Sequence, residues 1–151
     1  MDEIDGRILA ELQDDGRLTV TELAQRVSLS VSRCHRRLRD LEGSGAIRGY
    51  HADVDPGALG FGFEAVVFVT MNQEDRDTLA AFEAGLAAIP TVVQAQRLFG
   101  DPDYLLRVVA RDSADYQHTY DFDLSALPGV HRITSTIVMK DAVRRRRPPS
   151  R

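Results

Sequence analysis

Residues 19–50 of the 151-residue chain read TVTELAQRVSLSVSRCHRRLRDLEGSGAIRGY. Thr19 is followed three residues later by Glu22, a capping-box pattern that predicts the start of a short helix. A Ser-Leu-Ser sequence then interrupts this helix, and its last serine, Ser30, is expected to cap a second helix with its hydroxyl. Gly43-Ser44-Gly45 ends the second helix. The stretch therefore predicts two helices joined by a turn of about three residues.

The second predicted helix has an apolar face and a basic face. Its apolar side chains recur at helical spacing and are expected to be buried together: Val31, Cys34, Leu38 and Leu41. The opposite face and its flanks carry one hydroxyl, one imidazole and four guanidinium groups, on Ser32, Arg33, His35, Arg36, Arg37 and Arg39. Guanidinium groups beside a small hydroxyl suit phosphate contacts and bidentate reading of guanine edges. This layout is typical of a helix-turn-helix module, and these six residues are the predicted contacts to double-stranded DNA.

The alternative is a solvated helix that is simply rich in arginine, because runs of charge usually face water. The distribution of charge favours DNA. Residues 31–50 carry five Arg against Asp40 and Glu42, a formal +3, in a chain whose net charge is −4. Residues 141–151 form a second basic segment, which has no apolar anchor and is predicted to be a disordered tail. Basic side chains gathered at chosen places restrict the attraction of DNA to those surfaces.

A further helix is predicted upstream, from about residue 3 to residue 13, with Asp2 as its cap. Its apolar stripe consists of Ile4, Ile8, Leu9 and Leu12. Three helices in about 45 residues bury a very small core, which is marginal alone. The sequence therefore predicts a DNA-binding domain over residues 1–54 that depends on a second domain or on a dimer.

The second part of the chain has a different pattern. Residues 55–61, DPGALGF, have the composition of a linker. Beyond them, alternating strand and helix patterns are predicted at 63–71, 75–88, 92–99, 104–110, 113–127 and 130–139. Strand, helix, strand, strand, helix, strand is the order of a ferredoxin-like βαββαβ domain, here over residues 62–140 of an α+β protein.

Apolar residues run without interruption through 66–69 and, apart from Arg107, through 105–110, which is typical of strands buried on both faces. The helices of a ferredoxin-like domain cover one face of its sheet. The other face is therefore expected to pack against a second copy in a homodimer. A monomer with an ordinary apolar sheet is the alternative.

The chain contains the motifs IDGRIL (4–9), LQDDGR (12–17), ELA (22–24), LSVSRCHRRL (29–38) and GAIRGY (45–50). Together they resemble motifs of the leucine-responsive/asparagine regulator (Lrp/AsnC) family. One position departs from the family pattern, because Arg33 stands where a proline is usual. The resemblance covers nearly the whole chain. It implies a winged helix-turn-helix domain, a ferredoxin-like domain, dimers that assemble further into octamers, and an amino-acid effector.

The segment Gly100-Asp101-Pro102-Asp103-Tyr104 is an acidic turn between two predicted strands. From the sequence alone, this segment is predicted to be an ordinary hairpin turn. Asp101 or Asp103 could also pair with an α-ammonium group while turn amides receive a carboxylate. The resemblance implies that the matching segment lies near an amino acid bound between dimers, and hydroxyls from a neighbouring copy could complete that pocket. The predicted effector residues are Gly100, Asp101, Asp103, Tyr104, Thr134, Ser135 and Thr136.

Other classes of protein receive little support from the sequence. The four histidines lack metal-ligand spacing, no Gly-rich phosphate loop is present, and Cys34 lacks the context of a catalytic thiol. We therefore expect no metal, no cofactor and no enzyme activity. No apolar run approaches the roughly 20 residues that span a bilayer, and no export signal is recognisable, so a cytoplasmic protein is expected.

These observations predict a sequence-specific DNA-binding transcriptional regulator. Its assembly or its DNA affinity is expected to respond to a small amino acid. The alternative is an architectural DNA-binding protein of the same fold that needs no effector.

Overall fold

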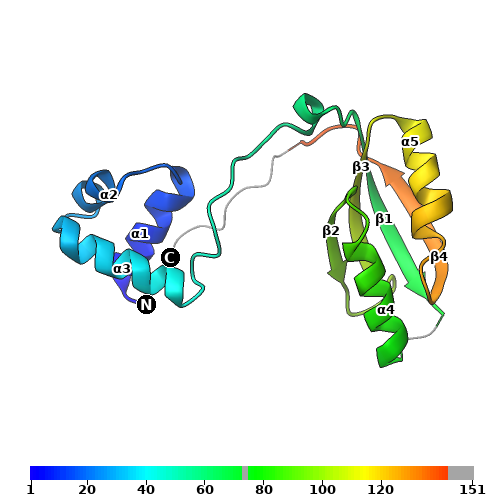
Figure 1. Cartoon of the computed structure of the whole chain (residues 1–151), viewed down its shortest axis with the longest axis horizontal. Helices are drawn as coiled ribbons and strands as arrows, with labels where there is room; N and C mark the ends of the chain where they lie inside the picture. The colour runs from blue at the N-terminus through cyan, green and yellow to red at the C-terminus, as the bar shows by residue number, and fades with distance from the viewer. Residues whose placement is uncertain (73–74, 143–151) are drawn as a thin grey trace. The chain divides into compact units, whose positions relative to one another are not determined.

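The computed structural model describes residues 1–72 and 75–142, which form two compact units, residues 1–53 and 54–142. Each unit has a hydrophobic core of its own. The first unit consists of three helices, α1 (Glu3–Asp14), α2 (Val20–Arg26) and α3 (Val31–Gly43) (Figure 1). The three predicted helices are confirmed. Residues 1–62 contain no β-strand, so the segment after α3 is not paired as a wing within this chain.

Capping boxes start both of the first two helices. The carboxylate of Asp2 accepts the N–H of Asp5, whose own carboxylate accepts the N–H of Asp2. Thr19 and Glu22 make the equivalent exchange at α2, as predicted. The predicted cap at α3 is wrong, because the Ser30 side chain makes no capping hydrogen bond; its hydroxyl lies 3.4 Å from that of Ser32.

The core of the first unit is small and comes from all three helices. Its buried members are Ile8, Leu23, Ala24, Val27, Cys34 and Leu41. Burial raises the pKa of the Cys34 thiol, as expected of a small core residue. The prediction for Val31 is wrong, because 48% of this residue is exposed. Val31 is the first residue of α3.

The second unit contains a four-stranded antiparallel sheet and the helices between its strands. Its elements in chain order are η1 (Pro56–Leu59), β1 (Phe63–Met71), α4 (Arg76–Ala87), β2 (Val92–Arg97), β3 (Tyr104–Ala110), α5 (Ser113–His118), η2 (Thr119–Leu124) and β4 (Val130–Ile137). The strand order β2-β3-β1-β4 is that of the predicted ferredoxin-like domain. The predicted helix at 113–127 is α-helical only as far as His118 and then continues as the π-helical turn η2.

The two faces of the sheet differ in burial. Figure 1 shows α4 and α5 on the same face. Alternate residues of β1 are buried beneath these helices, with Ala65 and Val67 fully enclosed. Val66, Phe68 and Leu105 point to the other face and are partly exposed. Within one chain the central strands are thus buried on one face, and the second face is the open face of the sheet.

Among the described residues, no helix is both long and apolar enough to cross a membrane. The predicted linker contains the short helix η1, which Asp55 caps by accepting the N–H of Gly57 at 3.0 Å. The predicted disordered tail lies almost entirely outside the described residues.

Candidate functional site

The turn between α2 and α3 is tight because of one unusual backbone conformation. Ser28 has a φ of 58°, the left-handed region that few residues other than glycine adopt. Leu29 then donates its N–H to the carbonyl of Ala24 at 2.9 Å. Four residues, 27–30, join α2 to α3, which begins at Val31. Nothing in the sequence pattern indicated that a serine would adopt this conformation.

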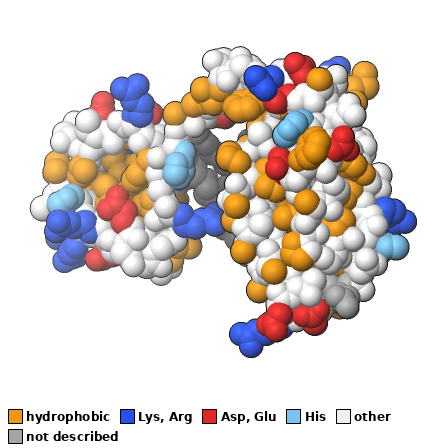
Figure 2. Space-filling model, turned by 45° about the vertical axis from the view of Figure 1, so that its right-hand side comes forward, with side chains coloured by type: hydrophobic (Ala, Val, Ile, Leu, Met, Phe, Trp, Pro, Cys, Tyr) orange, Lys and Arg blue, Asp and Glu red, His pale blue; other side chains and the backbone are white. Residues whose placement is uncertain are grey.

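Five of the six predicted DNA contacts lie on the solvent-exposed surface of α3. They are Ser32, Arg33, His35, Arg36 and Arg39. Figure 2 shows basic side chains gathered on one side of the first unit, with a histidine beside them. An exposed helix that carries several guanidinium groups after a tight turn can enter the major groove of DNA.

Arg37 differs from the other five. Its guanidinium donates to Asp2 at 2.8 Å and to Asp5 at 2.7 Å, both from α1. The hydrogen bonds to Asp5 and Asp2 raise the pKa of Arg37. The pKa of Asp2 is lowered, first by the N–H of Asp5 and also by Arg37. The structure therefore places this side chain between α3 and α1.

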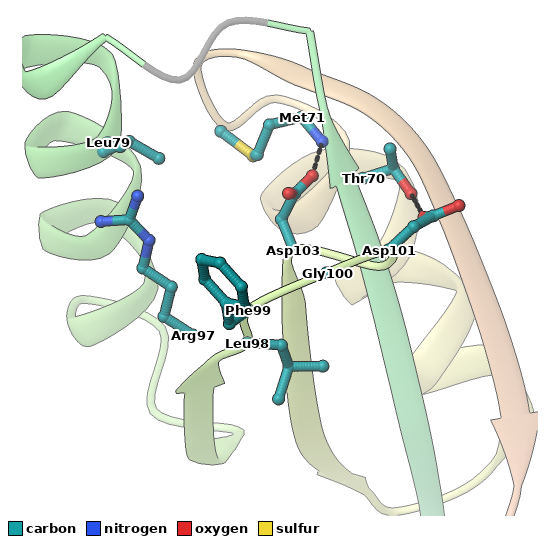
Figure 3. A pocket seen from close by; sticks show the side chains of 9 residues that line it. All are labelled: Thr70, Met71, Leu79, Arg97, Leu98, Phe99, Gly100, Asp101 and Asp103. Carbon is teal, nitrogen blue, oxygen red and sulfur yellow. Dashed lines mark hydrogen bonds between the residues drawn. The ribbon is translucent and has the colours of Figure 1, made fainter.

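A cavity of about 740 Å³ opens beside the predicted effector turn in the second unit (Figure 3). Its lining comes from the end of β1, from α4 and from the connection between β2 and β3. The lining residues are Thr70, Met71, Leu79, Arg97, Leu98, Phe99, Gly100, Asp101 and Asp103. Three of the predicted effector residues are thus part of one cavity.

Asp103 holds the turn against the sheet. Its carboxylate accepts the backbone N–H of Met71 at 2.7 Å, and its own N–H donates to the carbonyl of Val69 at 3.0 Å. Leu98 donates its N–H to the carbonyl of Asp103 at 2.7 Å. A carboxylate engaged in this way has a structural role at the end of β1.

Asp101 is much less constrained. Its carboxylate lies 3.3 Å from the hydroxyl of Thr70 and 3.7 Å from the guanidinium of Arg132, and 74% of the side chain is exposed. Gly100 precedes it with a φ of 137°, which favours glycine. The turn thus presents one largely solvated carboxylate.

Tyr104 belongs to the core rather than to the cavity lining. It is 2% exposed, its ring packs on that of Phe82 with centroids 4.7 Å apart, and its hydroxyl donates to Glu83 at 2.8 Å. Burial, followed by the hydrogen bond to Glu83, raises the pKa of Tyr104 to about 12. Its position is therefore a packing position for the start of β3.

Sequence reasoning missed three residues of the cavity lining that come directly before the acidic turn, Arg97, Leu98 and Phe99. In Figure 3 the ring of Phe99 lies between the guanidinium of Arg97 and the carboxylate of Asp103. Phe99 is fully exposed and Leu98 is 38% exposed. Two large apolar residues directly before a polar turn are a signal that could have indicated these positions.

Comparisons with known protein families give a match for each of the two units. Residues 1–48 match the family description "Winged helix-turn-helix DNA-binding", and residues 64–148 match "Lrp/AsnC ligand binding domain". The chain belongs to the Lrp/AsnC family of transcriptional regulators.

Individual Lrp/AsnC proteins are similar over almost the full length. The Bkd operon transcriptional regulator of Pseudomonas aeruginosa is 40% identical over 149 residues, covering 99% of this chain and 97% of the relative. The leucine-responsive regulatory protein of Rhizobium meliloti is 39% identical over 140 residues, covering 93% and 90%. A transcriptional regulator of Neisseria meningitidis, solved with L-methionine, has a TM-score of 0.91 at 34% identity and covers 99% and 96%.

This Lrp/AsnC chain therefore combines a DNA-binding domain with a ligand-binding domain, and the predicted class of transcriptional regulator is confirmed. Among the described residues, no group of three His, Cys, Asp or Glu side chains is placed to hold a metal ion.

The three hydroxyl residues of β4 do not share one face. Thr134 pairs with Phe68 and Thr136 with Val66, which places both on the open face. Ser135 lies on the helix-covered face, where its hydroxyl is hydrogen-bonded to that of Tyr116. None of the three lines the cavity in their own chain. Their contribution to the pocket of a neighbouring copy stays a prediction.

Proposed function

We propose that this Lrp/AsnC regulator binds a small amino acid in the cavity beside the β2–β3 turn, and that the bound amino acid changes its assembly or its affinity for DNA. The observation that carries the proposal is the mixed lining of the cavity. Arg97 supplies a cation, Asp101 supplies a largely solvated carboxylate, and Met71, Leu79 and Phe99 supply apolar walls. A zwitterion with an apolar side chain matches this combination of groups.

The assignment of roles follows from the hydrogen bonds already made. Asp103 is engaged by the N–H of Met71, so Asp101 is the carboxylate available to an α-ammonium group. The guanidinium of Arg97 is available to an α-carboxylate. The complex of the Neisseria regulator with L-methionine supports a ligand of this class.

The DNA contacts are proposed on the exposed surface of α3, from Ser32, Arg33, His35, Arg36 and Arg39. A two-fold dimer would present two copies of α3 to DNA half-sites with centres about 34 Å apart, or at a multiple of that distance. The protein acts by binding rather than by catalysis, in the cytoplasm.

The open face of the sheet is the proposed surface of the dimer. Val66, Phe68 and Leu105 expose apolar surface there, next to an ion pair between Glu64 and Arg107. Burial of such a face against a second copy removes its apolar surface from water. Further assembly to an octamer rests on the resemblance to the family.

DNA binding in the presence of ligand tests the proposal. The protein is titrated onto the DNA upstream of its own gene, with and without each amino acid, while the size of the assembly is followed by light scattering. We expect one amino acid or a small group to shift affinity or size. Binding that is indifferent to every amino acid at millimolar concentration would favour the architectural alternative.

A matched pair of variants ties the response to the cavity. Asp101→Asn removes the proposed partner of the ammonium group and is expected to weaken effector binding without a loss of DNA affinity. Asp121→Asn makes the same change at an exposed position of η2, outside the cavity lining, and is expected to leave the response intact. Equal responses in both variants would show that Asp101 does not bind the effector.

A further inference from the structure

The first turn of α1 holds two carboxylates side by side. In the capping box, one oxygen of Asp2 accepts the N–H of Asp5 and one oxygen of Asp5 accepts the N–H of Asp2, each at 2.9 Å. The remaining oxygen of each carboxylate accepts a hydrogen bond from the same nitrogen, Nη1 of Arg37, at 2.8 and 2.7 Å. All four carboxylate oxygens are thus engaged in a single arrangement, which we call the Arg37 clamp.

The side chain of Arg37 is less exposed to solvent than those of the other arginines of α3. The side chain of Arg37 is 28% exposed and that of Asp5 is 15% exposed. Within described residues 1–53, Arg37 is the only arginine of α3 that makes an ion pair, whereas Arg33, Arg36 and Arg39 are exposed. At about 100° per residue, Arg37 lies at the edge of the exposed arc of α3, next to Arg33.

We infer that Arg37 is a positioning residue that Asp2 and Asp5 withhold from DNA, so that the clamp limits how many cations α3 offers to the phosphate backbone. This inference rests on the proposed role of α3 in DNA binding and goes beyond it. The two carboxylates accept hydrogen bonds from Nη1 of the guanidinium, as phosphate oxygens could. With two acids against one cation, the clamp also has a formal charge of −1.

Electrostatics explains why the withheld arginine matters. Each phosphate that a protein neutralises releases counterions and steepens the dependence of log K on log salt by about 0.9. This contribution is independent of sequence and dominates non-specific binding. An arginine that is held by α1 orients α3 without adding to non-specific affinity, which leaves a larger share of the binding to base contacts.

The test measures the salt dependence of binding to a duplex of unrelated sequence. The double variant Asp2→Asn/Asp5→Asn keeps side chains that can cap a helix but removes both charges. We expect its slope of log K against log salt to steepen by about 0.9 for each copy of α3 bound, hence by about 1.8 for a dimer, with non-specific affinity raised several-fold at low salt. Arg37→Ala in the wild-type background is expected to leave the slope unchanged. Arg37→Ala added to the double variant is expected to reverse the steepening.

Two controls separate this effect from a general change in charge or fold. Glu3→Gln/Asp53→Asn removes two negative charges from the same unit without touching the clamp, and its slope is expected to match the wild type. Circular dichroism reports whether each variant is folded. If the double variant does not fold, Asp2→Asn alone takes its place, because Asp2 is the more exposed partner at 54%.

A slope that falls by about 0.9 for each copy of α3 in Arg37→Ala alone would overturn the inference, because Arg37 would then already contact a phosphate. A double variant that binds DNA with the same slope of log K against log salt as the wild type would also overturn the inference. A wild-type protein that binds no DNA would overturn both the clamp and the proposed role of α3.

Discussion

Replacing Asp103 by alanine is expected to destabilise the ligand-binding unit. The half-buried carboxylate accepts the N–H of Met71 at 2.7 Å, and Met71 is itself only 7% exposed at the end of β1. Hydrogen bonds to charged groups contribute about 1.5–3 kcal/mol. Alanine leaves the N–H of Met71 without this acceptor, so we expect a loss of that size in the free energy of unfolding.

Urea denaturation followed by circular dichroism measures this loss. With a typical slope of about 1.5 kcal/mol per M, the midpoint is expected to fall by roughly 1–2 M. All variants are compared at one subunit concentration, because the stability of an oligomer depends on concentration.

Asp101→Ala is the matched control for Asp103→Ala. Asp101 lies two residues away in the same turn, but it is largely solvated and its contacts are long. Its replacement is expected to change stability by less than about 0.5 kcal/mol. Equal losses in the two variants, or no loss in Asp103→Ala, would refute the assignment of a structural role to Asp103 and a largely solvated carboxylate to Asp101.

Three further results are expected. Arg36→Ala should weaken specific DNA binding by about 1–3 kcal/mol if Arg36 reads a guanine, and an unchanged affinity and salt slope in a gel-shift titration would contradict this contact. Leu106→Ala should cost about 2–5 kcal/mol in thermal or urea unfolding, because Leu106 is fully buried. Tyr104 should ionise near pH 12 in the folded protein, against about 10 in the unfolded chain. Its contribution to stability is then complete below pH 10 and is lost as the pH rises toward 12; loss of the late step of tyrosinate absorbance in Tyr104→Phe checks the assignment.

Local sequence signals determined most of the secondary structure. The capping boxes at Asp2 and Thr19 indicated where α1 and α2 begin, and the bounds of β1 and β3 agree with the predicted 63–71 and 104–110. Each of these signals depends on three to five neighbouring residues, so it can be recognised in a single segment of the sequence. The ferredoxin-like order of elements followed from the same signals.

The tertiary structure decided which predicted functional side chains are free. Arg37, Tyr104 and Ser135 all fitted a functional pattern, yet each is engaged within the chain by Asp2 and Asp5, by Glu83 or by Tyr116. Each of these partners lies 19 to 35 residues away in the sequence. Periodicity assigns a side chain to a face of a helix or strand, but the partner on that face is brought there only when distant elements pack together.

The acidic turn, residues 100–104, shows both what the sequence determined and what the tertiary structure decided. Its composition determined that a polar hairpin would join β2 and β3. Packing against the end of β1 then engaged Asp103 with the N–H of Met71 and left Asp101 in solvent. The physical reason is that an unpaired backbone N–H at a buried strand end requires an acceptor, and only the folded sheet sets which carboxylate reaches it.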